Sequence, residues 1–311
     1  MKRFFQAYLC LLAGGLIFAF PSVLQAADGT WTGAINNNWN NNGNWNGATF
    51  PNATADDAVL GNAIATDTTI TLGENITVRA IKFEDDNKYT LTGNQLTLGT
   101  SLVTLNQAGT GAVQIDSAVV LSDNAIFTGA GTGAVTINGV VSGAFNLAKS
   151  GVSFTLYLTG ANTYTGSTTV DAGVLNIQNA AALGATSGNT TVSSGAQLEL
   201  QGNITVAVGE DLTISGTGIS GTGAIQNISG SNTIAGLITL AAASTIAAEF
   251  GSTLTLSGAV GHSGAGKAIE IGYAALGAGG TGTVVLSGGT ASTVGTSWNL
   301  KSGTLVLNKT A

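Results

Sequence analysis

The stretch that decides the fold runs Leu156-Tyr-Leu-Thr-Gly160-Ala-Asn-Thr-Tyr164-Thr-Gly166-Ser-Thr-Thr-Val170-Asp-Ala-Gly173-Val-Leu175-Asn-Ile177. It ends on a glycine, a spacer residue and two aliphatic residues separated by one, Gly173 to Ile177. This alternation is typical of a short β-strand whose alternate side chains face one way, entered through a residue that tolerates positive φ. Thr168-Thr-Val170 predicts another short strand just before it.

The Gly173 to Ile177 unit is repeated along the chain. Starts at 73, 93, 111 and 133 lie 18 to 22 residues apart, and further copies start at 173, 195, 251, 282 and 303. One unit cannot bury its own apolar face, but stacked units form continuous aliphatic rows. Short strands at near-constant spacing also suit a sandwich or barrel. The all-β solenoid is favoured because two-residue hairpin turns are not the rule here.

The composition agrees with stacking. The chain has 311 residues, including 46 glycines, yet only 8% are charged while 44% are hydrophobic. Side chains in neighbouring coils lie about 4.8 Å apart, so like charges in one column would repel each other, whereas Thr and Asn columns can hydrogen-bond. One histidine and one cysteine leave little material for catalysis.

The N-terminal segment, residues 1–26, has the three parts of a secretory signal. Met1-Lys2-Arg3 is positive, Phe4 to Phe20 is mostly apolar, and small residues precede a predicted cleavage after Ala26 or Ala27. The alternative is an uncleaved membrane anchor. Cleavage removes Cys10 and leaves 9 − 2 = 7 basic against 16 acidic residues, a net charge of −9. Without a basic patch or a long apolar run, the mature chain is expected to bind no nucleic acid and to span no membrane.

Residues 27–62 differ from the repeats. They hold Trp31, Trp39 and Trp45, beside the Asn-rich stretch Asn36 to Asn46. A solenoid exposes an unpaired strand edge at each end, and a bulky atypical segment can cover it, so we interpret 27–62 as an N-terminal cap. Aromatic residues stacking on sugar rings are the alternative. Residues 63–311 are the repeats; Ala311 follows the last unit by four residues, so we expect an incomplete or uncapped C-terminus and self-association through the open edge.

Motifs for chemistry are weak. Gly261 to Lys267 resembles a phosphate-binding loop, but Ala268 replaces the metal-binding Ser/Thr and a strand pattern follows where a helix is needed. His262 is the single histidine, which rules out a multi-histidine metal site. Glu84, Asp85 and Asp86 form the densest acidic cluster, interpreted either as a weak calcium site or as a solvated turn. We expect no catalytic residue and no cofactor.

The opening stretch, with Ala182-Leu183-Gly184 after it, closely resembles the autotransporter-associated β-strand repeat, also called the passenger-associated transport repeat. The positions that carry the resemblance are Gly160, Asn162, Tyr164, Gly166, Val170, Gly173 and Leu175. It implies a right-handed parallel β-helix, secreted or carried on the outer surface of a Gram-negative cell as a passenger and serving adhesion or export. A host surface or glycan is the implied partner. The alternating strands of a translocator barrel are not seen in this sequence, which is expected if it is a fragment or is exported another way.

A β-helical polysaccharide lyase or hydrolase is the alternative function. It needs carboxylates gathered on one face, for acid–base chemistry or calcium. The acidic residues of the repeats are isolated in sequence and fall at no single position of the unit; they include Asp116, Asp171, Glu199, Glu249 and Glu270. The sequence therefore favours a non-catalytic structural or adhesion role.

Overall fold

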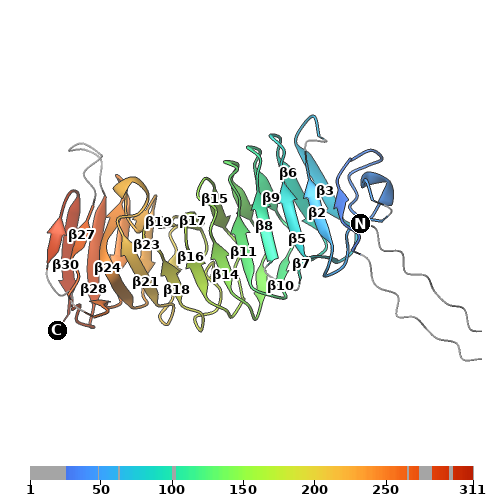
Figure 1. The fold of residues 1–311 in the computed structure, drawn as a ribbon. Coiled ribbons are helices and arrows are strands. Elements are labelled where there is room, and N and C mark those ends of the chain that lie inside the picture. The colour runs from blue at the N-terminus through green and yellow to red at the C-terminus, as the bar shows by residue number, and fades with distance from the viewer. Residues whose placement is uncertain are drawn as a thin grey trace, which may run out of the picture.

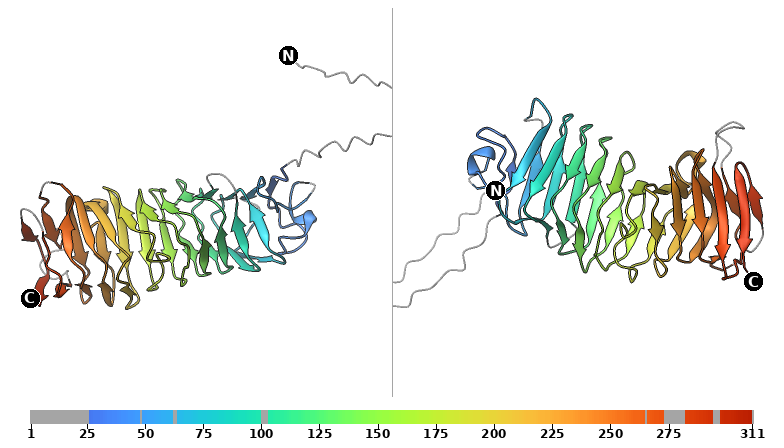
Figure 2. Two further views of the ribbon diagram at one scale, coloured as in Figure 1. Left: turned by 90° about the horizontal axis from the view of Figure 1, so that it is seen from below. Right: turned by 180° about the vertical axis from the view of Figure 1, so that it is seen from behind.

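The computed structural model describes residues 26–47, 49–61, 64–99, 103–264, 266–272, 282–293 and 297–310. Over these residues the chain winds through about 11 turns of a parallel β-solenoid. The strands stack along one axis into an elongated rod, with β1 near one end and β30 at the other (Figure 1, Figure 2). The predicted all-β solenoid is confirmed. The predicted signal segment lies almost wholly outside the described residues, so its removal stays a prediction.

Each coil has up to three strands. Equivalent strands of successive coils pair in parallel and form three faces of the solenoid. The first face contains β3 (Thr68–Leu72), β6 (Tyr89–Gly93), β9 (Val113–Ile115), β12 (Val135–Ile137), β15 (Thr155–Leu158), β17 (Gly173–Ile177), β19 (Ala196–Leu200), β22 (Ile225–Asn227), β27 (Ile269–Ile271) and β29 (Trp298–Leu300). The second contains β4 (Ile76–Val78), β7 (Leu96–Leu98), β10 (Val119–Leu121) and β13 (Val141–Gly143), then β20 (Thr205–Val206), β23 (Ser231–Ile234), β25 (Thr253–Leu256), β28 (Thr283–Gly288) and β30 (Thr304–Lys309).

The third face contains β1 (Gly29–Thr30), β2 (Asp57–Leu60), β5 (Ala80–Phe83), β8 (Val103–Gln107), β11 (Ala125–Thr128), β14 (Leu147–Lys149), β16 (Thr168–Val170), β18 (Thr190–Val192), β21 (Leu212–Gly216) and β26 (Val260–His262). The long strand β24 (Ile238–Ala248) pairs with β21 and β26 through its first half and with β22 and β27 through its second. Two 3-10 helices are described, η1 (Asn42–Asn44) and η2 (Ile219–Gly221). No helix among the described residues has the length and apolarity to cross a bilayer.

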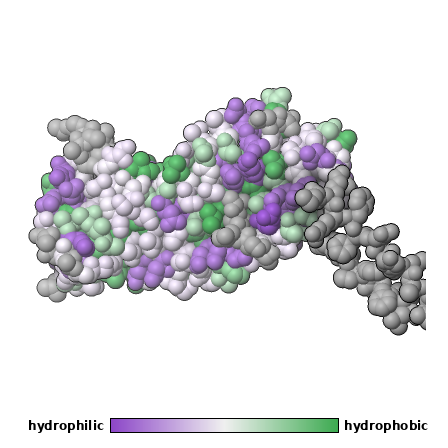
Figure 3. All heavy atoms as spheres, viewed as in Figure 1, coloured by the Kyte–Doolittle hydropathy of each residue, from purple (hydrophilic) through white to green (hydrophobic). Residues whose placement is uncertain are grey.

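The register aligns the aliphatic positions of successive units. Leu156 pairs with Leu175, which pairs with Leu198, and all three side chains are fully buried. Burying one such side chain contributes about 1.5–3 kcal/mol, so each added coil extends a continuous apolar interior. The visible outer surface carries separate hydrophilic and hydrophobic patches on a pale, weakly polar ground (Figure 3). This is the arrangement expected from the low charge content.

Glycines mark corners where one coil crosses closely over the next. A Cβ on Gly166 would lie 2.2 Å from the carbonyl oxygen of Phe145, and one on Gly188 would lie 2.0 Å from that of Gly166. Neither contact is possible for a real side chain, so the backbone spacing of the solenoid requires glycine at these positions. The high glycine content thus follows from the stacking of coils.

The tryptophan-rich segment after Ala27 covers the first coil, so the predicted Trp/Asn-rich N-terminal cap is confirmed. Trp45 packs edge-on against Trp31 and Trp39, with ring centroids 5.2 and 4.6 Å apart. All three indoles are at most 4% exposed, so they are not available for stacking on sugars. The backbone N–H of Trp39 donates to Thr71 O (3.0 Å) in β3, which occupies the strand edge that would otherwise be open.

Turns from the third face to the first differ in length. The turn between β16 and β17 is Asp171 and Ala172 alone, whereas residues 129–134 join β11 to β12 and residues 217–224 join β21 to β22. Where these turns are short the upper outline of the rod dips, over β17 and β19 (Figure 1), and the space-filling view is hollowed there (Figure 3). The parallel pairing of the strands continues on both sides of these turns, with a register shift between Ile214 and Gly216 at the end of β21.

Candidate functional site: the repeat and its neighbours

Residues 156–177 contribute to β15, β16 and β17. The second face of the solenoid is unusual in this region. Among the described residues no strand is assigned over 159–167 or 178–189, although β13 and β20 occupy that face in the coils on either side. The chain there is held by side chains and by single backbone contacts. Thr163 N donates to Val141 O at 2.8 Å and Thr165 N donates to Gly143 O at 2.9 Å.

Asn162 connects three successive coils. Its Oδ1 accepts from Val141 N at 2.8 Å in the preceding coil, and its Nδ2 donates to Ala182 O at 2.7 Å in the following one. The side chain is only 3% exposed. The amide therefore satisfies one backbone donor and one backbone acceptor that a regular strand would otherwise pair.

Tyr164 begins a polar cluster inside the solenoid. Its fully buried hydroxyl lies 2.6 Å from Thr168 Oγ1. Thr168 pairs in register with Thr190, whose Oγ1 donates to Glu210 Oε1 at 2.7 Å. Burial raises the pKa of Tyr164, and burial raises the pKa of Glu210 to about 7. The other carboxylate oxygen of Glu210 is buried without a hydrogen-bond partner.

The remaining repeat positions serve packing. Val170 and Leu175 lie in the aliphatic rows and are fully buried. Gly160 and Gly173 are corner residues. A Cβ on Gly160 would lie 2.6 Å from Gly139 O, while Gly173 adopts φ +70° and a Cβ there would lie 2.3 Å from Gly151 O. The seven motif residues are thus distributed around one coil, at its corners and in its interior.

Lys149 was missed by the sequence analysis. It occupies an interior position in register with Phe127 and Val170, and its side chain is fully buried. Its Nζ donates to Gly151 O and to Ala172 O and lies 4.0 Å from the centre of the Phe154 ring. Burial lowers the pKa of Lys149 to about 8. The alternation in Leu147-Ala-Lys149 was the available signal for this interior position.

Amide and carboxylate side chains form a row on the first face. Asn176, Glu199 and Gln226 are aligned by the pairing of β17, β19 and β22. Asn176 Nδ2 donates to Glu199 Oε2 at 2.8 Å. Gln226 accepts from Gln197 Nε2 and donates to Glu249 Oε1. The carboxylates of Glu199 and Glu249 thus each accept a hydrogen bond from an amide side chain.

Glu199 and Glu249 lie near enough to influence each other. Burial raises the pKa of Glu199, the hydrogen bond from Asn176 opposes this, and the charge of Glu249 adds to the rise. The two residues are isolated in sequence but lie on the same side of the solenoid, with Gln226 of the intervening coil between them. Residues 50 positions apart come this close because each coil advances the chain by only one strand spacing.

The three calcium candidates do not converge. Glu84 pairs with Lys82, Asp85 Oδ1 accepts from Asn87 N at 2.8 Å, and Asp86 Oδ1 accepts from Thr110 Oγ1 at 2.6 Å. In the described part of the chain no three acidic, histidine or cysteine side chains are grouped to hold a metal ion. Calcium binding at Glu84, Asp85 and Asp86 stays a prediction.

The loop resembling a phosphate-binding motif lies between strands. Gly261 and His262 belong to β26, and the sequence after Lys267 forms β27 where such a motif needs a helix. His262 Nδ1 lies 3.1 Å from Gly264 O. The strand expected after Lys267 is confirmed.

Comparison with known proteins places these features in a family context. The family model of the passenger-associated-transport-repeat matches residues 155–177. The chain is 34% identical over 172 residues to the BmaC adhesin autotransporter of Brucella suis biovar 1, an alignment that covers 55% of this chain and 4% of that protein. No solved structure gives a significant match. Residues 155–177 are therefore a passenger-associated transport repeat, set in a parallel β-solenoid similar in sequence to part of an autotransporter adhesin.

Proposed function

We propose that the chain is part of a non-catalytic, cell-surface passenger with a structural or adhesion role. The observation that carries this proposal is the repeat at residues 155–177 within a parallel β-solenoid. The similarity to an autotransporter adhesin supports it. The carboxylates of Glu199 and Glu249 are hydrogen-bonded by amide side chains of the same face, which suits a scaffold.

The same proposal includes a route and a location. The chain is exported through the Sec route, loses residues 1–26 and stands on the outer surface of, or is released by, a Gram-negative cell. Residues 27–62 then cap the solenoid and residues 63–311 supply its length. The rod presents its turns to a host surface or glycan, while the aliphatic rows keep those turns at fixed spacing.

Location and adhesion are tested together in the organism that encodes the chain. Antibodies against the purified chain are expected to label intact cells, and deletion of its gene is expected to reduce attachment to host cells several-fold. Labelling only after permeabilisation would contradict the location. Attachment that is unchanged in the deletion strain, and not inhibited by added purified chain, would contradict the adhesion role.

Catalysis is tested separately by incubating the purified chain with acidic polysaccharides, with and without calcium. We expect no release of reducing or unsaturated ends. Release that disappears in a Glu199→Gln, Glu249→Gln double variant would assign an active site to the carboxylate pair and overturn the non-catalytic proposal.

A further inference from the structure

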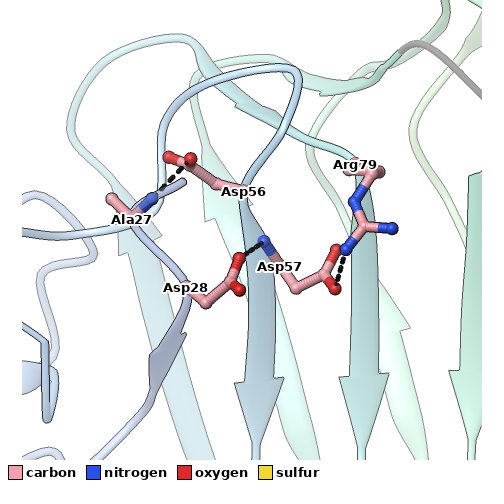
Figure 4. Close-up of polar contacts among 5 residues, drawn as sticks. All are labelled: Ala27, Asp28, Asp56, Asp57 and Arg79. Carbon is pink, nitrogen blue, oxygen red and sulfur yellow. Dashed lines mark hydrogen bonds and ion pairs between the residues drawn. The ribbon is translucent and has the colours of Figure 1, made fainter. Parts of the chain in front are cut away.

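A buried carboxylate at the start of the cap accepts from the backbone at the predicted cleavage site. Asp56 is 3% exposed, and its Oδ1 accepts from Ala27 N at 2.7 Å (Figure 4). Its Oδ2 accepts from Asn52 N at 2.9 Å. The carboxylate is therefore fixed in place by two backbone amides from different segments of the cap.

Asp56 has no cationic side chain as partner among the ion pairs of the described residues. The nearby Arg79 pairs with Asp57 at 2.5 Å, and Asp28 accepts from Asp57 N at 2.8 Å (Figure 4). A buried carboxylate is costly unless a positive charge or strong hydrogen bonds compensate it. Cleavage after Ala26 would turn the Ala27 amide into an ammonium group at this contact, whereas cleavage after Ala27 would remove the donor.

There is room for the additional hydrogens of an ammonium group. Ala27 is partly exposed and Ala26 is exposed. A shallow depression of about 340 Å³ opens beside them, and its lining includes Ala27, Thr49 and Asp56. An ammonium at Ala27 can thus donate one hydrogen bond to Asp56 and keep the others in water.

We propose that processing between Ala26 and Ala27 creates an α-ammonium group that pairs with Asp56 and fastens the cap. The contact holds the chain just before β1, which pairs with β2 and leads directly into Trp31 of the tryptophan cluster. Removal of the N-terminal segment and closure of the cap are then coupled through one charge-assisted hydrogen bond. This inference rests on the proposed export, since a chain that keeps residues 1–26 has an amide at this position.

The first test is the N-terminus of the exported chain, read by intact mass and N-terminal sequencing. We expect the chain to begin at Ala27. A first residue of Asp28 would overturn the inference while leaving export intact, whereas a cytoplasmic, unprocessed chain would contradict the proposed function itself.

The second test uses the processed protein and its selectively N-acetylated form, which keeps the N–H but loses the charge. Near-ultraviolet circular dichroism follows the buried tryptophans of the cap during heating. Acetylation is expected to lower the cap transition by on the order of 2 °C, the shift that a modest loss of stability causes in a chain of this size. In Asp56→Asn acetylation should change nothing, whereas in the control Asp28→Asn it should still lower the transition.

An equal effect of acetylation in the unsubstituted protein and in Asp56→Asn would overturn the pairing. If Asp56→Asn does not fold, the α-amino pKa of the unsubstituted protein decides, measured by NMR after isotopic methylation. The charged groups around it are Asp56, Asp28, Asp57 and Arg79. A pKa clearly above the ordinary range of about 7.7–8.0 supports the pair, and a pKa within that range contradicts it.

Discussion

Lys149 and Glu210 are two of the charged side chains buried among the described residues, and their polar contacts differ. Lys149 has carbonyl oxygens and the face of Phe154 around its Nζ. Glu210 has one hydrogen bond from Thr190 and one oxygen without a partner. Because one of its buried oxygens has no hydrogen-bond partner, the ionised form of Glu210 is costly in the folded state.

Glu210 predicts a pH dependence of stability. Its pKa is raised from the ordinary 4.5 to about 7 because burial, and to a lesser extent the charge of Asp211, outweigh the lowering by the hydrogen bond from Thr190. The folded state therefore binds the proton more tightly than the unfolded state. The resulting stability is complete below about pH 4.5 and is lost as the pH rises through 7, by up to about 3 kcal/mol.

The measurement is the urea midpoint of unfolding between pH 4 and pH 8 for the unsubstituted chain and Glu210→Gln. Glutamine keeps an acceptor for Thr190 and carries no charge, so the variant is expected to be the more stable protein at pH 8 and to lose the advantage near pH 4. Glu74→Gln, at an exposed position, is the matched control. Parallel pH profiles for the unsubstituted chain and Glu210→Gln would contradict the assignment.

At the scale of the element, the repeat replaces a strand by an amide. The side chain of Asn162 hydrogen-bonds to the backbone of β13 and to Ala182 O, and so joins adjacent coils as backbone hydrogen bonds do elsewhere on the second face. Asn232 repeats part of this device, since its Oδ1 accepts from Ile204 N at 2.7 Å. Asn232 itself lies in β23, which pairs with β20, so a buried asparagine joins adjacent coils both where a strand is present and, at Asn162, where none is assigned.

Asn162→Ala is expected to destabilise the coils around β15 by about 2–4 kcal/mol. The substitution leaves Val141 N and Ala182 O buried without partners, and each such group costs about 1–3 kcal/mol. Hydrogen exchange measures the effect directly, because the amide of Val141 should exchange much faster in the variant. The control is Asn189→Ala, at an exposed position in the same region. Equal protection of Val141 in both variants would contradict the role of Asn162.

At the scale of the whole molecule, the sequence was sufficient for the architecture and insufficient for the contacts between coils. The spacing of units such as Gly173 to Ile177 predicted stacked strands, and the tryptophans predicted the cap. Neighbours across coils depend on the exact number of residues per coil, which varies: Leu156 and Leu175 are 19 positions apart, whereas Leu198 and Ile225 are 27 apart. For this reason the row that joins Glu199 to Glu249 could not be read from the sequence.

The register predicts that a whole coil can be removed. Tyr89, Val113 and Val135 occupy equivalent positions in β6, β9 and β12, so deletion of residues 113–134 brings β12 onto β6 with every row aligned. The variant is expected to keep its β-sheet circular dichroism and to be shorter by about 4.8 Å in small-angle X-ray scattering. Deletion of residues 113–123 shifts the rows by half a coil and is expected to unfold the neighbouring coils. Equal stability of the two deletions would contradict a register-dependent solenoid.

The unequal turns between the third and first faces have a consequence for how such a molecule can diversify. A turn of two residues at 171–172 and a turn of eight at 217–224 are carried by the same stacked strands. Substitutions at exposed positions such as Thr217 and Ser220 leave the interior unchanged, as expected of surface loops on a rigid scaffold, whereas Ala172 and Ala224 contact the interior. The exposed positions of each turn can therefore change independently of those in other turns. The surface chemistry of the rod can diversify in this way while its stacked architecture is preserved.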